Sequence, residues 1–301
     1  MKKIKLIYNP FAGDTTFKNQ LDDIVEILQG YNWYVSLFRV THYGDIDEHF
    51  KKMDKNYYDA IAVSGGDGTI NLALNAMIKN GLNIPLGIFP SGTANDFASY
   101  IGIPKDPVEA AKVIGNGVSK KVDIGKINND YFINVVCSGL FAKISQGVDP
   151  VLKNSIGKLA YYLKGAEAIA NIKPVALRVT TSTSVIEVNT ILLLIMNTSG
   201  AGGFNNLAPA SNLADGKFDL LIYKSKGNIA KDAKPFIQSL RGTHIKDENV
   251  IYLQDSYFKI ELVEEESEFT QTDIDGERGP DLPIEVKVME GMLTLFLPDK
   301  E

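Results

Sequence analysis

The stretch AVSGGDGTIN, residues 62–71, connects a strand-like apolar run to a helix-like one through a turn with glycines at 65, 66 and 68. Such a turn exposes backbone N–H groups at the start of a helix, which is how many phosphate sites are built. Asp67 lies within the turn, although a carboxylate ~4 Å from a phosphate oxygen would repel it by ~1 to 4 kcal/mol, depending on the effective dielectric. The stretch is therefore either a phosphate site that compensates this charge or a plain connecting turn.

Strand-like and helix-like periods alternate along the first part of the chain, on both sides of this turn. Apolar residues spaced three and four apart indicate helices, and short apolar runs indicate strands. The expected strands cover residues 4–8, 33–40, 59–63, 84–89 and 120–124, and the expected helices cover 21–28, 46–53, 70–78 and 107–114. This alternation predicts an α/β domain over residues 1–125 with a mostly parallel sheet. Ligands of such sheets bind beyond the carboxyl ends of the strands.

From Lys126 onward the pattern changes to strand after strand, with turn residues between them. Residues 126–136 and 174–197 each have the pattern of a hairpin. Further strands are expected at 218–223, 249–254, 256–263, 268–274, 283–289 and 291–297, with helices at 157–170 and 229–240. The second domain is therefore predicted to be mainly antiparallel over residues 126–289. A chain of this length exceeds one core, which favours two domains. The C-terminal segment, about 290–301, could return to the first domain.

A second glycine-containing loop, FPSGTANDFA at residues 89–98, again follows directly on a strand. Several of its residues can offer N–H or hydroxyl donors or cap the next short helix, namely Ser91, Gly92, Thr93, Asn95 and Asp96. The P-loop and dinucleotide patterns are both excluded, because no Gly-Lys pair precedes Ser or Thr and residue 71 is asparagine. We expect the two glycine loops to converge on one ligand, and nucleotide phosphates are the simplest choice.

Composition excludes several classes of partner. A net charge of −6 argues against nucleic acid, whose recognition needs concentrated Lys and Arg. The longest apolar run, Ile191 to Met196, is too short to span a membrane, so any lipid contact is expected to be peripheral. Cys137 is the single cysteine, so no intrachain disulfide can form and a reducing cytosol fits best. It is either a small buried apolar residue or a reactive thiol, and His42, His49 and His244 have no metal-binding spacing.

Four motifs in order along the chain carry a resemblance: NPFAG at 9–13, GGDGTIN at 65–71, PSGTANDFA at 90–98 and DGE at 275–277. Together they resemble the diacylglycerol kinase catalytic family in its soluble bacterial lipid-kinase branch. The similarity extends to VDIGKINNDYFINV and AYYLKGAEAI, although GGDGT alone is shared with NAD kinases and phosphofructokinase-like enzymes. The resemblance implies an α/β N-terminal domain of the phosphofructokinase and NAD-kinase type, which binds the nucleotide. It also implies a β-sandwich C-terminal domain that binds the lipid substrate.

The activity implied by this resemblance is transfer of the γ-phosphoryl group of ATP to a lipid hydroxyl, with Mg²⁺ as a required ion. Diacylglycerol, giving phosphatidic acid, is the leading acceptor. Asp67 would meet phosphate through magnesium, which resolves the repulsion, and Asp96 would help to position the same ion. The implied ATP contacts, at the cleft between the domains, are Asn9, Pro10, Phe11, Ala12, Gly13, Thr41, Gly65, Gly66, Asp67, Gly68, Thr69, Ile70, Asn71 and Thr93.

The DGE motif has two interpretations. Asp275-Gly276 is a common hairpin turn, whereas the resemblance implies that Asp275 and Glu277 are the catalytic acids that take the proton from the lipid hydroxyl. On a strand these two side chains could share one face. A structural Mg²⁺ is implied at Asp215, with carbonyls near Asn212 and Lys217 as further ligands, and a plain turn is the alternative there.

The expected protein is cytoplasmic and meets its lipid substrate transiently at the inner face of the membrane, and a homodimer is possible through an exposed strand. Two rival functions are open. An NAD kinase shares GGDGT and the domain layout but gives no reason for NPFAG or for the late DGE. A noncatalytic nucleotide or lipid sensor on the same scaffold is the second rival, and retention of both Asp275 and Glu277 counts against it.

Overall fold

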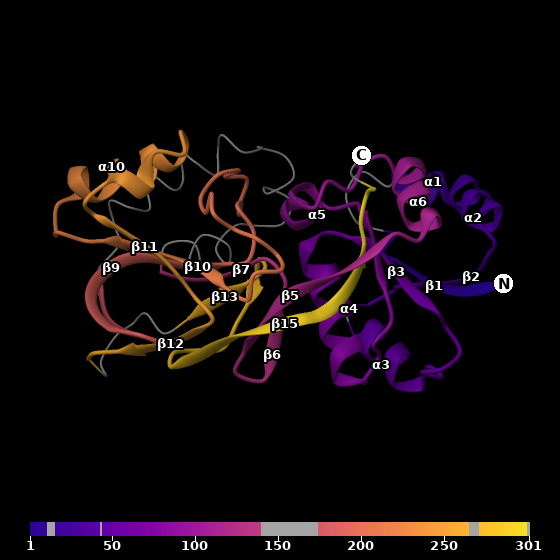
Figure 1. Cartoon of the computed structure of the whole chain (residues 1–301), viewed down its shortest axis with the longest axis horizontal. Helices are drawn as coiled ribbons and strands as arrows, with labels where there is room; N and C mark the ends of the chain where they lie inside the picture. The colour runs from indigo at the N-terminus through magenta and orange to yellow at the C-terminus, as the bar shows by residue number, and fades with distance from the viewer. Residues whose placement is uncertain (11–15, 43, 140–173, 265–270, 300–301) are drawn as a thin grey trace. The chain divides into compact units, whose positions relative to one another are not determined.

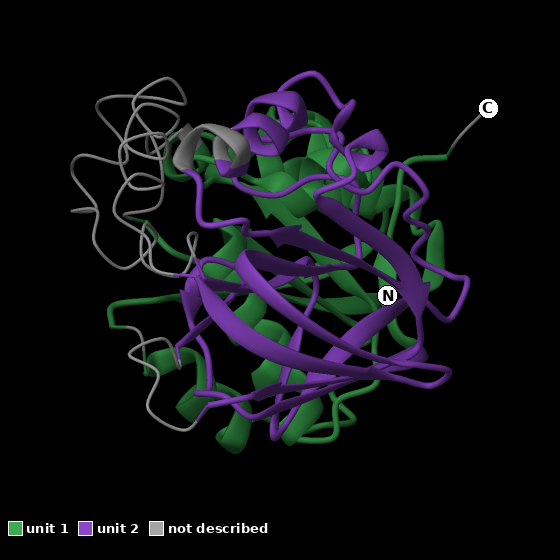
Figure 2. Cartoon of the chain, turned by 90° about the vertical axis from the view of Figure 1, so that its left-hand side faces the viewer, with its two compact units in different colours: residues 1–122, 291–301 green, residues 123–290 purple. Residues whose placement is uncertain are grey.

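The computed structural model describes residues 1–10, 16–42, 44–139, 174–264 and 271–299. The chain forms two compact units, drawn in separate colours in Figure 2. Unit 1 comprises Met1–Val122 together with Gly291–Glu301, and unit 2 comprises Asp123–Glu290. The expected helix over 157–170 lies outside the described residues, and so does the start of the strand expected at 268–274.

Unit 1 is built on a parallel sheet with the strand order β4-β3-β1-β2. Its strands are β1 (Lys2–Tyr8), β2 (Trp33–Arg39), β3 (Ala60–Gly65) and β4 (Leu86–Pro90). Every residue of β3 and β4 is buried, as expected for central strands covered on both faces. The predicted α/β domain with a mostly parallel sheet is thus confirmed.

Helices cover both faces of this sheet (Figure 1). They are α1 (Thr16–Asn19), α2 (Leu21–Gly30), α3 (Asp45–Lys52), α4 (Asp67–Lys79), α5 (Asp96–Tyr100) and α6 (Pro107–Asn116). α2 packs against α6, and α3 packs against α4. The ends of α6 follow from its sequence: Asp106 accepts a hydrogen bond from the Glu109 N–H, Pro107 is the first helical residue, and Gly117 ends the helix at φ 71°.

The register of the parallel strands brings their carboxyl ends to one edge of the sheet. Tyr8, at the end of β1, pairs with Arg39 at the end of β2 and with Ser64 on β3, while Gly65 pairs with Pro90 at the end of β4. β2 follows on one side of β1, whereas β3 and β4 follow on the other side, so the strand order reverses between β1 and β3. This edge is therefore the topological switch point, where open α/β sheets bind their ligands.

Unit 2 is mainly antiparallel, as predicted. Its strands are β5 (Ser119–Ile127), β6 (Asp130–Phe132), β7 (Val135–Gly139), β8 (Val175–Thr181), β9 (Val185–Met196), β10 (Phe218–Lys224), β11 (Val250–Asp255), β12 (Tyr257–Leu262), β13 (Thr272–Ile274), β14 (Glu277–Arg278) and β15 (Ile284–Phe296), of which β5 begins and β15 ends in unit 1. The hairpins β5-β6 and β8-β9 confirm the two expected from sequence. The helical elements are α10 (Ile229–Ser239) and the short 3-10 helix η1 (His244–Lys246).

The apolar run at the end of β9 is explained by burial on both of its faces. Leu193 and Ile195 belong to one hydrophobic cluster, together with residues of β8, β10 and β12. Leu192 and Leu194 face the other way, into a second cluster with Phe236 of α10 and residues of the 199–209 loop. Strands covered on one side by a sheet and on the other by a helix and a loop have no polar face, so alternation is lost.

One predicted boundary is wrong. The sequence suggested separate strands at 283–289 and 291–297, but β15 runs without interruption through both. Gly291 has φ +55°, a conformation that other residues adopt only with strain. The glycine lies where this continuous strand leaves unit 2 and enters unit 1.

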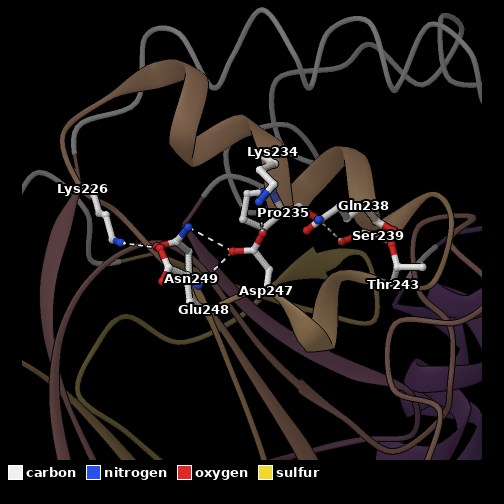
Figure 3. Close-up of polar contacts among 9 residues, drawn as sticks. All are labelled: Lys226, Lys234, Pro235, Gln238, Ser239, Thr243, Asp247, Glu248 and Asn249. Atoms are coloured by element: carbon white, nitrogen blue, oxygen red, sulfur yellow. Dashed lines mark hydrogen bonds and ion pairs between the residues drawn. The ribbon is translucent and has the colours of Figure 1, made fainter.

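Helix α10 is held by polar contacts with residues 247–249, which connect η1 to β11, and within its own last turn (Figure 3). Lys234 Nζ lies 2.9 Å from Asp247 Oδ2, and the buried Asp247 also accepts hydrogen bonds from Asn249. The backbone N–H of Asn249, followed by Lys234, holds the pKa of Asp247 below its ordinary value. No helix in the described part of the chain is long and apolar enough to cross a membrane.

Acid should weaken unit 1 through His49. The ring of His49 stacks on the ring of Phe38, with their centroids 3.8 Å apart. Burial, followed by the charge of Lys5, lowers the pKa of His49 to about 4. In the unfolded chain the histidine is protonated near pH 6.5, whereas in the folded chain it is protonated only near pH 4. The free energy of unfolding therefore falls as the pH drops between these two values. The loss is at most about 3 kcal/mol.

His49→Phe keeps the ring stack and removes the titration. Denaturant unfolding at pH 7 and pH 4.5 measures the effect as the difference between variant and wild type, because buried His244 contributes a loss of the same sign in both proteins. The variant is expected to lose less stability than wild type on acidification. Equal losses in the two proteins would rule out this role for His49.

Candidate functional site

In the turn between β3 and α4, the packing of Thr69 requires glycine at position 65. A Cβ on Gly65 would lie 2.3 Å from the Cβ of Thr69, so glycine is required for the threonine to pack against the end of the strand. Gly66 is the N-cap residue of α4 and offers no side chain to cap the first turn. Asp67 is the first residue of this 13-residue helix. The turn thus presents the N-terminal end of a long helix at the carboxyl edge of the sheet.

The two glycine loops meet, as the sequence predicted. A Cβ on Gly92 would lie 2.3 Å from Gly66 Cα, so the two backbones are in direct contact. The Ser91 N–H donates to the Gly65 carbonyl at 3.1 Å, and the Ser64 and Ser91 hydroxyls are 3.0 Å apart. The amide of Ser91 thus joins the loops, although the sequence suggested that it would serve a ligand.

Asn95 and Asp67 have structural roles that the sequence did not indicate. Asn95 precedes α5 in a left-handed conformation, but its side chain does not cap that helix. Its Oδ1 accepts from the Gly92 N–H at 2.8 Å and its Nδ2 donates to the Gly92 carbonyl at 2.6 Å. The carboxylate of Asp67 instead accepts from the N–H groups of Asp96 and Phe97, at 3.3 and 3.4 Å. The capping role expected of Asn95 or Asp96 is therefore taken by Asp67.

The remaining predicted contacts of unit 1 lie at or near the same edge of the sheet. Asn9 follows β1 and donates its N–H to the Ser64 carbonyl at 3.2 Å, and buried Pro10 comes next. Thr41 follows β2, and its amide and hydroxyl both donate to Asp45. Further predicted residues lie on α4 or in the second loop: Gly68, Thr69, Ile70 and Asn71, and Thr93. Phe11, Ala12 and Gly13 lie outside the described residues.

These loops fit a nucleotide phosphate with a metal ion better than phosphate alone. The end of α4 supplies the partial positive charge and the N–H groups that attract phosphate oxygens. Neither AVSGGDGTIN nor FPSGTANDFA contains a lysine or an arginine. The carboxylate of Asp67 accepts long hydrogen bonds from the N–H groups of Asp96 and Phe97 at the start of α5. Within these loops, Asp67 is a carboxylate that could hold a divalent cation beside such a phosphate.

The DGE motif of unit 2 is a hairpin turn. Asp275 and Gly276 have φ values of 52° and 89°, and Ile274 pairs with Glu277 across the turn between β13 and β14. Positive φ at both central residues is the type I′ arrangement. The expectation that Asp275 and Glu277 share a face of one strand is therefore wrong, because the chain reverses between them. Glu277 is exposed at the start of β14.

Asp275 is buried and its carboxylate is used by the backbone. Its Oδ1 accepts from the N–H groups of Asn134 and Val135 at 2.9 and 2.8 Å, and its Oδ2 accepts from the N–H of Ile133 at 2.9 Å. Only 5% of the residue is exposed. Asp275 thus fastens the turn to the chain between β6 and β7.

The loop predicted to hold a structural metal is organised by turns. Asn212 Oδ1 accepts from the Ala214 N–H at 3.1 Å, and Asp215 Oδ1 accepts from the Lys217 N–H at 3.1 Å. Buried Asp123 accepts from the Gly216 N–H at 2.8 Å. Within the described ranges, no group of three or more His, Cys, Asp or Glu side chains gathers closely enough to hold a metal ion.

Sequence reasoning missed three carboxylates that organise these loops. Asp45 accepts from Thr41 and His42, and the Thr41 hydroxyl lowers the pKa of Asp45 to about 2. Asp273 is buried and accepts from the Gly276 N–H at 2.9 Å, and Asp123 is described above. Asp45 and Asp273 have short-range partners typical of turns. The partner of Asp123 lies 93 positions later in the chain, so sequence windows could not reveal it. Cys137 is buried, and burial followed by the charge of Asp273 raises its pKa well above the ordinary value.

Comparison with known proteins identifies both parts of the chain. Residues 3–127 match the diacylglycerol kinase catalytic domain, and residues 134–297 match the YegS C-terminal NAD kinase beta sandwich-like domain. The diacylglycerol kinase of Bacillus subtilis strain 168 is 36% identical over all of this chain and 98% of its own length. The diacylglycerol kinase of Staphylococcus aureus strain JH9 is 34% identical over 99% of this chain and 93% of its own.

Solved structures agree. The crystal structure of a diacylglycerol kinase from Bacillus anthracis strain Sterne has a TM-score of 0.81 at 26% identity, covering 99% of this chain and 98% of that one. Another structure from that organism has a TM-score of 0.85 at 28% identity, covering 99% and 96%. The α/β domain with parallel strands and the antiparallel β-sandwich are thereby both confirmed. The chain belongs to the diacylglycerol kinase family, in its soluble bacterial branch, and is a phosphotransferase with an alcohol group as acceptor.

Proposed function

We propose that this protein is a lipid kinase that depends on ATP and Mg²⁺ and transfers the γ-phosphoryl group to diacylglycerol, giving phosphatidic acid. The observation that carries the proposal is the contact between the β3–α4 turn and the 91–95 loop, next to the uncapped start of α4. Relatives named diacylglycerol kinase, similar over the full chain, supply the acceptor. NAD kinase activity is the alternative that the assay below must exclude.

The residues of unit 1 would bind and orient the triphosphate. The N–H groups at the start of α4 would face the phosphate oxygens, and glycine at 66 and 92 lets the two backbones approach closely. ATP would supply the phosphoryl group, and Mg²⁺ would supply positive charge that neutralises the phosphates. Asp67 would hold that ion on the side of α5. Asn9, Thr41 and the remaining predicted contacts would border the nucleotide at the same edge of the sheet.

The acids of the DGE turn in unit 2 would handle the proton. Phosphoryl transfer needs positioning and charge neutralisation more than covalent chemistry, so one carboxylate near the acceptor hydroxyl suffices. Asp275 and Glu277 are the two candidates.

Contact with the membrane is proposed to be peripheral, from the cytoplasmic side. Ile237 of α10 and Leu240 just after it are 55% and 49% exposed, and Arg241 and Lys246 are exposed nearby. Apolar side chains beside cations suit an anionic lipid surface. A homodimer also stays a prediction; β2, an edge strand with exposed Tyr34 and Leu37, is the place where a second copy could pair.

The direct test is phosphate transfer from radiolabelled Mg-ATP to a fractionated lipid extract, with NAD in a parallel reaction. Labelled phosphatidic acid is the expected product. Label on NAD alone would replace the proposal with an NAD kinase. Nucleotide binding without transfer to any acceptor would favour a sensor on a kinase scaffold.

Asp67→Asn separates charge from shape. The amide can still accept a hydrogen bond from α5, so the melting temperature is expected to stay near that of wild type. Transfer should fall by at least about 100-fold, since even outer-shell partners of a metal are worth 10- to 100-fold. Glu109→Gln, in the first turn of α6, is the matched control and should keep full activity. A variant at position 67 with undiminished transfer would remove Asp67 from the site.

Asp215→Asn tests the structural Mg²⁺ proposed at the 212–217 loop. Thermal melting with magnesium and with chelator is the measurement. Wild type should melt at a higher temperature with magnesium, because an ion that binds only the folded state stabilises it. The variant should show a smaller shift and keep its transfer activity. Identical melting in all four conditions would dismiss this ion.

A further inference from the structure

We propose that Asp45 is a positioning residue of the nucleotide site: it holds the hydroxyl proton of Thr41, so that Thr41 Oγ can only accept a hydrogen bond from the nucleotide. This acceptor selects a hydrogen-bond donor of the nucleoside, which is either a ribose hydroxyl or the 6-amino group of adenine. The inference rests on the proposed function, in which Thr41, just after β2, borders the nucleotide at the carboxyl edge of the sheet.

One carboxylate oxygen of Asp45 organises the chain after β2. Asp45 Oδ2 accepts hydrogen bonds from the N–H of Thr41 at 2.7 Å, from the N–H of His42 at 2.8 Å and from the hydroxyl of Thr41. Asp45 is the first residue of α3, where the helix dipole favours a negative charge. The end of β2 and the start of α3 are therefore held together by three donors on one oxygen atom.

The direction of the hydroxyl hydrogen bond follows from the charge of Asp45. The hydroxyl of Thr41, followed by the backbone N–H groups of His42 and Thr41, lowers the pKa of Asp45 to about 2, so the carboxylate is ionised at neutral pH. An ionised carboxylate carries no proton and can only accept. Thr41 must therefore donate its single hydroxyl proton to Asp45, and its oxygen can offer a ligand only lone pairs.

His42 occupies one of these lone pairs. Its Nδ1 lies 3.0 Å from Thr41 Oγ. Since the hydroxyl proton is already held by Asp45, this hydrogen bond requires a proton on Nδ1 of His42, with Thr41 as the acceptor. Both Thr41 and His42 are exposed. Among the contacts of the described residues, one lone pair of Thr41 Oγ is thus left for a ligand, and its partner must be a donor.

The proposed place of the phosphates decides which part of ATP can meet Thr41. Phosphate oxygens are acceptors, so they suit the N–H groups at the start of α4 and not the lone pair of a hydroxyl. β2 lies two strands away from β3, with β1 between them. Because neighbouring strands are ~4.8 Å apart, the ends of β3 and β2 are separated by about 10 Å. An extended nucleotide with its phosphates at α4 therefore reaches the end of β2 with its ribose or its base.

The test is the dissociation constant of Mg-ATP, measured by titration calorimetry for wild type and for Thr41→Val, which keeps the shape of the side chain and removes the acceptor. The variant should bind ATP about 5- to 10-fold more weakly, as expected for one lost hydrogen bond. Three analogues identify the donor: 2′-deoxy-ATP, 3′-deoxy-ATP and ITP, in which an oxo group replaces the 6-amino group. One of them should bind wild type more weakly than ATP by the same factor, yet bind Thr41→Val as well as ATP does.

Variants of Asp45 separate positioning from charge. Asp45→Asn keeps a carbonyl oxygen that can accept the same three hydrogen bonds, so affinity and selectivity should stay within about twofold of wild type. Asp45→Ala frees the Thr41 hydroxyl to donate as well as to accept, so the selectivity among the analogues should be lost. Asp47→Ala, which removes an ion pair with Lys51 from the same helix, is the matched control and should keep both affinity and selectivity.

Equal affinity of Thr41→Val and wild type for ATP would overturn the inference. Additive losses with all three analogues, or wild-type selectivity in Asp45→Ala, would do the same. If Asp45→Ala does not fold, the comparison of Thr41→Val with wild type still decides the matter. Calorimetry needs no lipid, so ATP binding without lipid phosphorylation would refute the proposed function alone, while the titrations would still decide the role of Asp45.

Discussion

The backbone contact between Gly66 and Gly92 is the constraint on which the candidate nucleotide site depends. No side chain fits between the two loops, and the hydrogen bond from Ser91 to Gly65 fixes them in register with the ends of β3 and β4. The side chain of Asn95 then hydrogen-bonds both the N–H and the carbonyl of Gly92. With the loops joined in this way, the start of α5 is brought to the carboxylate of Asp67. One close approach of two glycines therefore sets the geometry of two helix starts.

This arrangement gives a structural reason for an acid inside a glycine-rich turn. Asp67 is stabilised from two sides, because it is the first residue of α4 and also faces the first N–H groups of α5. Negative charge is favoured at the start of a helix. Sequence reasoning gave magnesium as the only answer to the charge. The hydrogen bonds from the start of α5 stabilise the charge of Asp67 in the absence of a ligand. A bound cation would stabilise that charge further.

Patterns within short windows were the reliable part of the sequence. The strands β1 to β4, the hairpins of unit 2 and helix α10 were all expected from periodicity and turn residues. Two of the failures depend on a partner distant in the chain. The sequence divided β15 into two strands, because the continuity of this strand is set by pairing partners elsewhere in the chain. The role of Asp275 was hidden because its hydrogen-bond donors lie about 140 positions earlier.

The central claim is that the joined glycine loops hold a triphosphate through a cation at Asp67. A crystal structure with Mg²⁺ and a non-hydrolysable ATP analogue tests it most directly. The account predicts phosphate oxygens against the N–H groups at the start of α4, with the metal between them and the carboxylate of Asp67. Phosphates bound away from the β3–α4 turn, or bound there with no metal near Asp67, would contradict it.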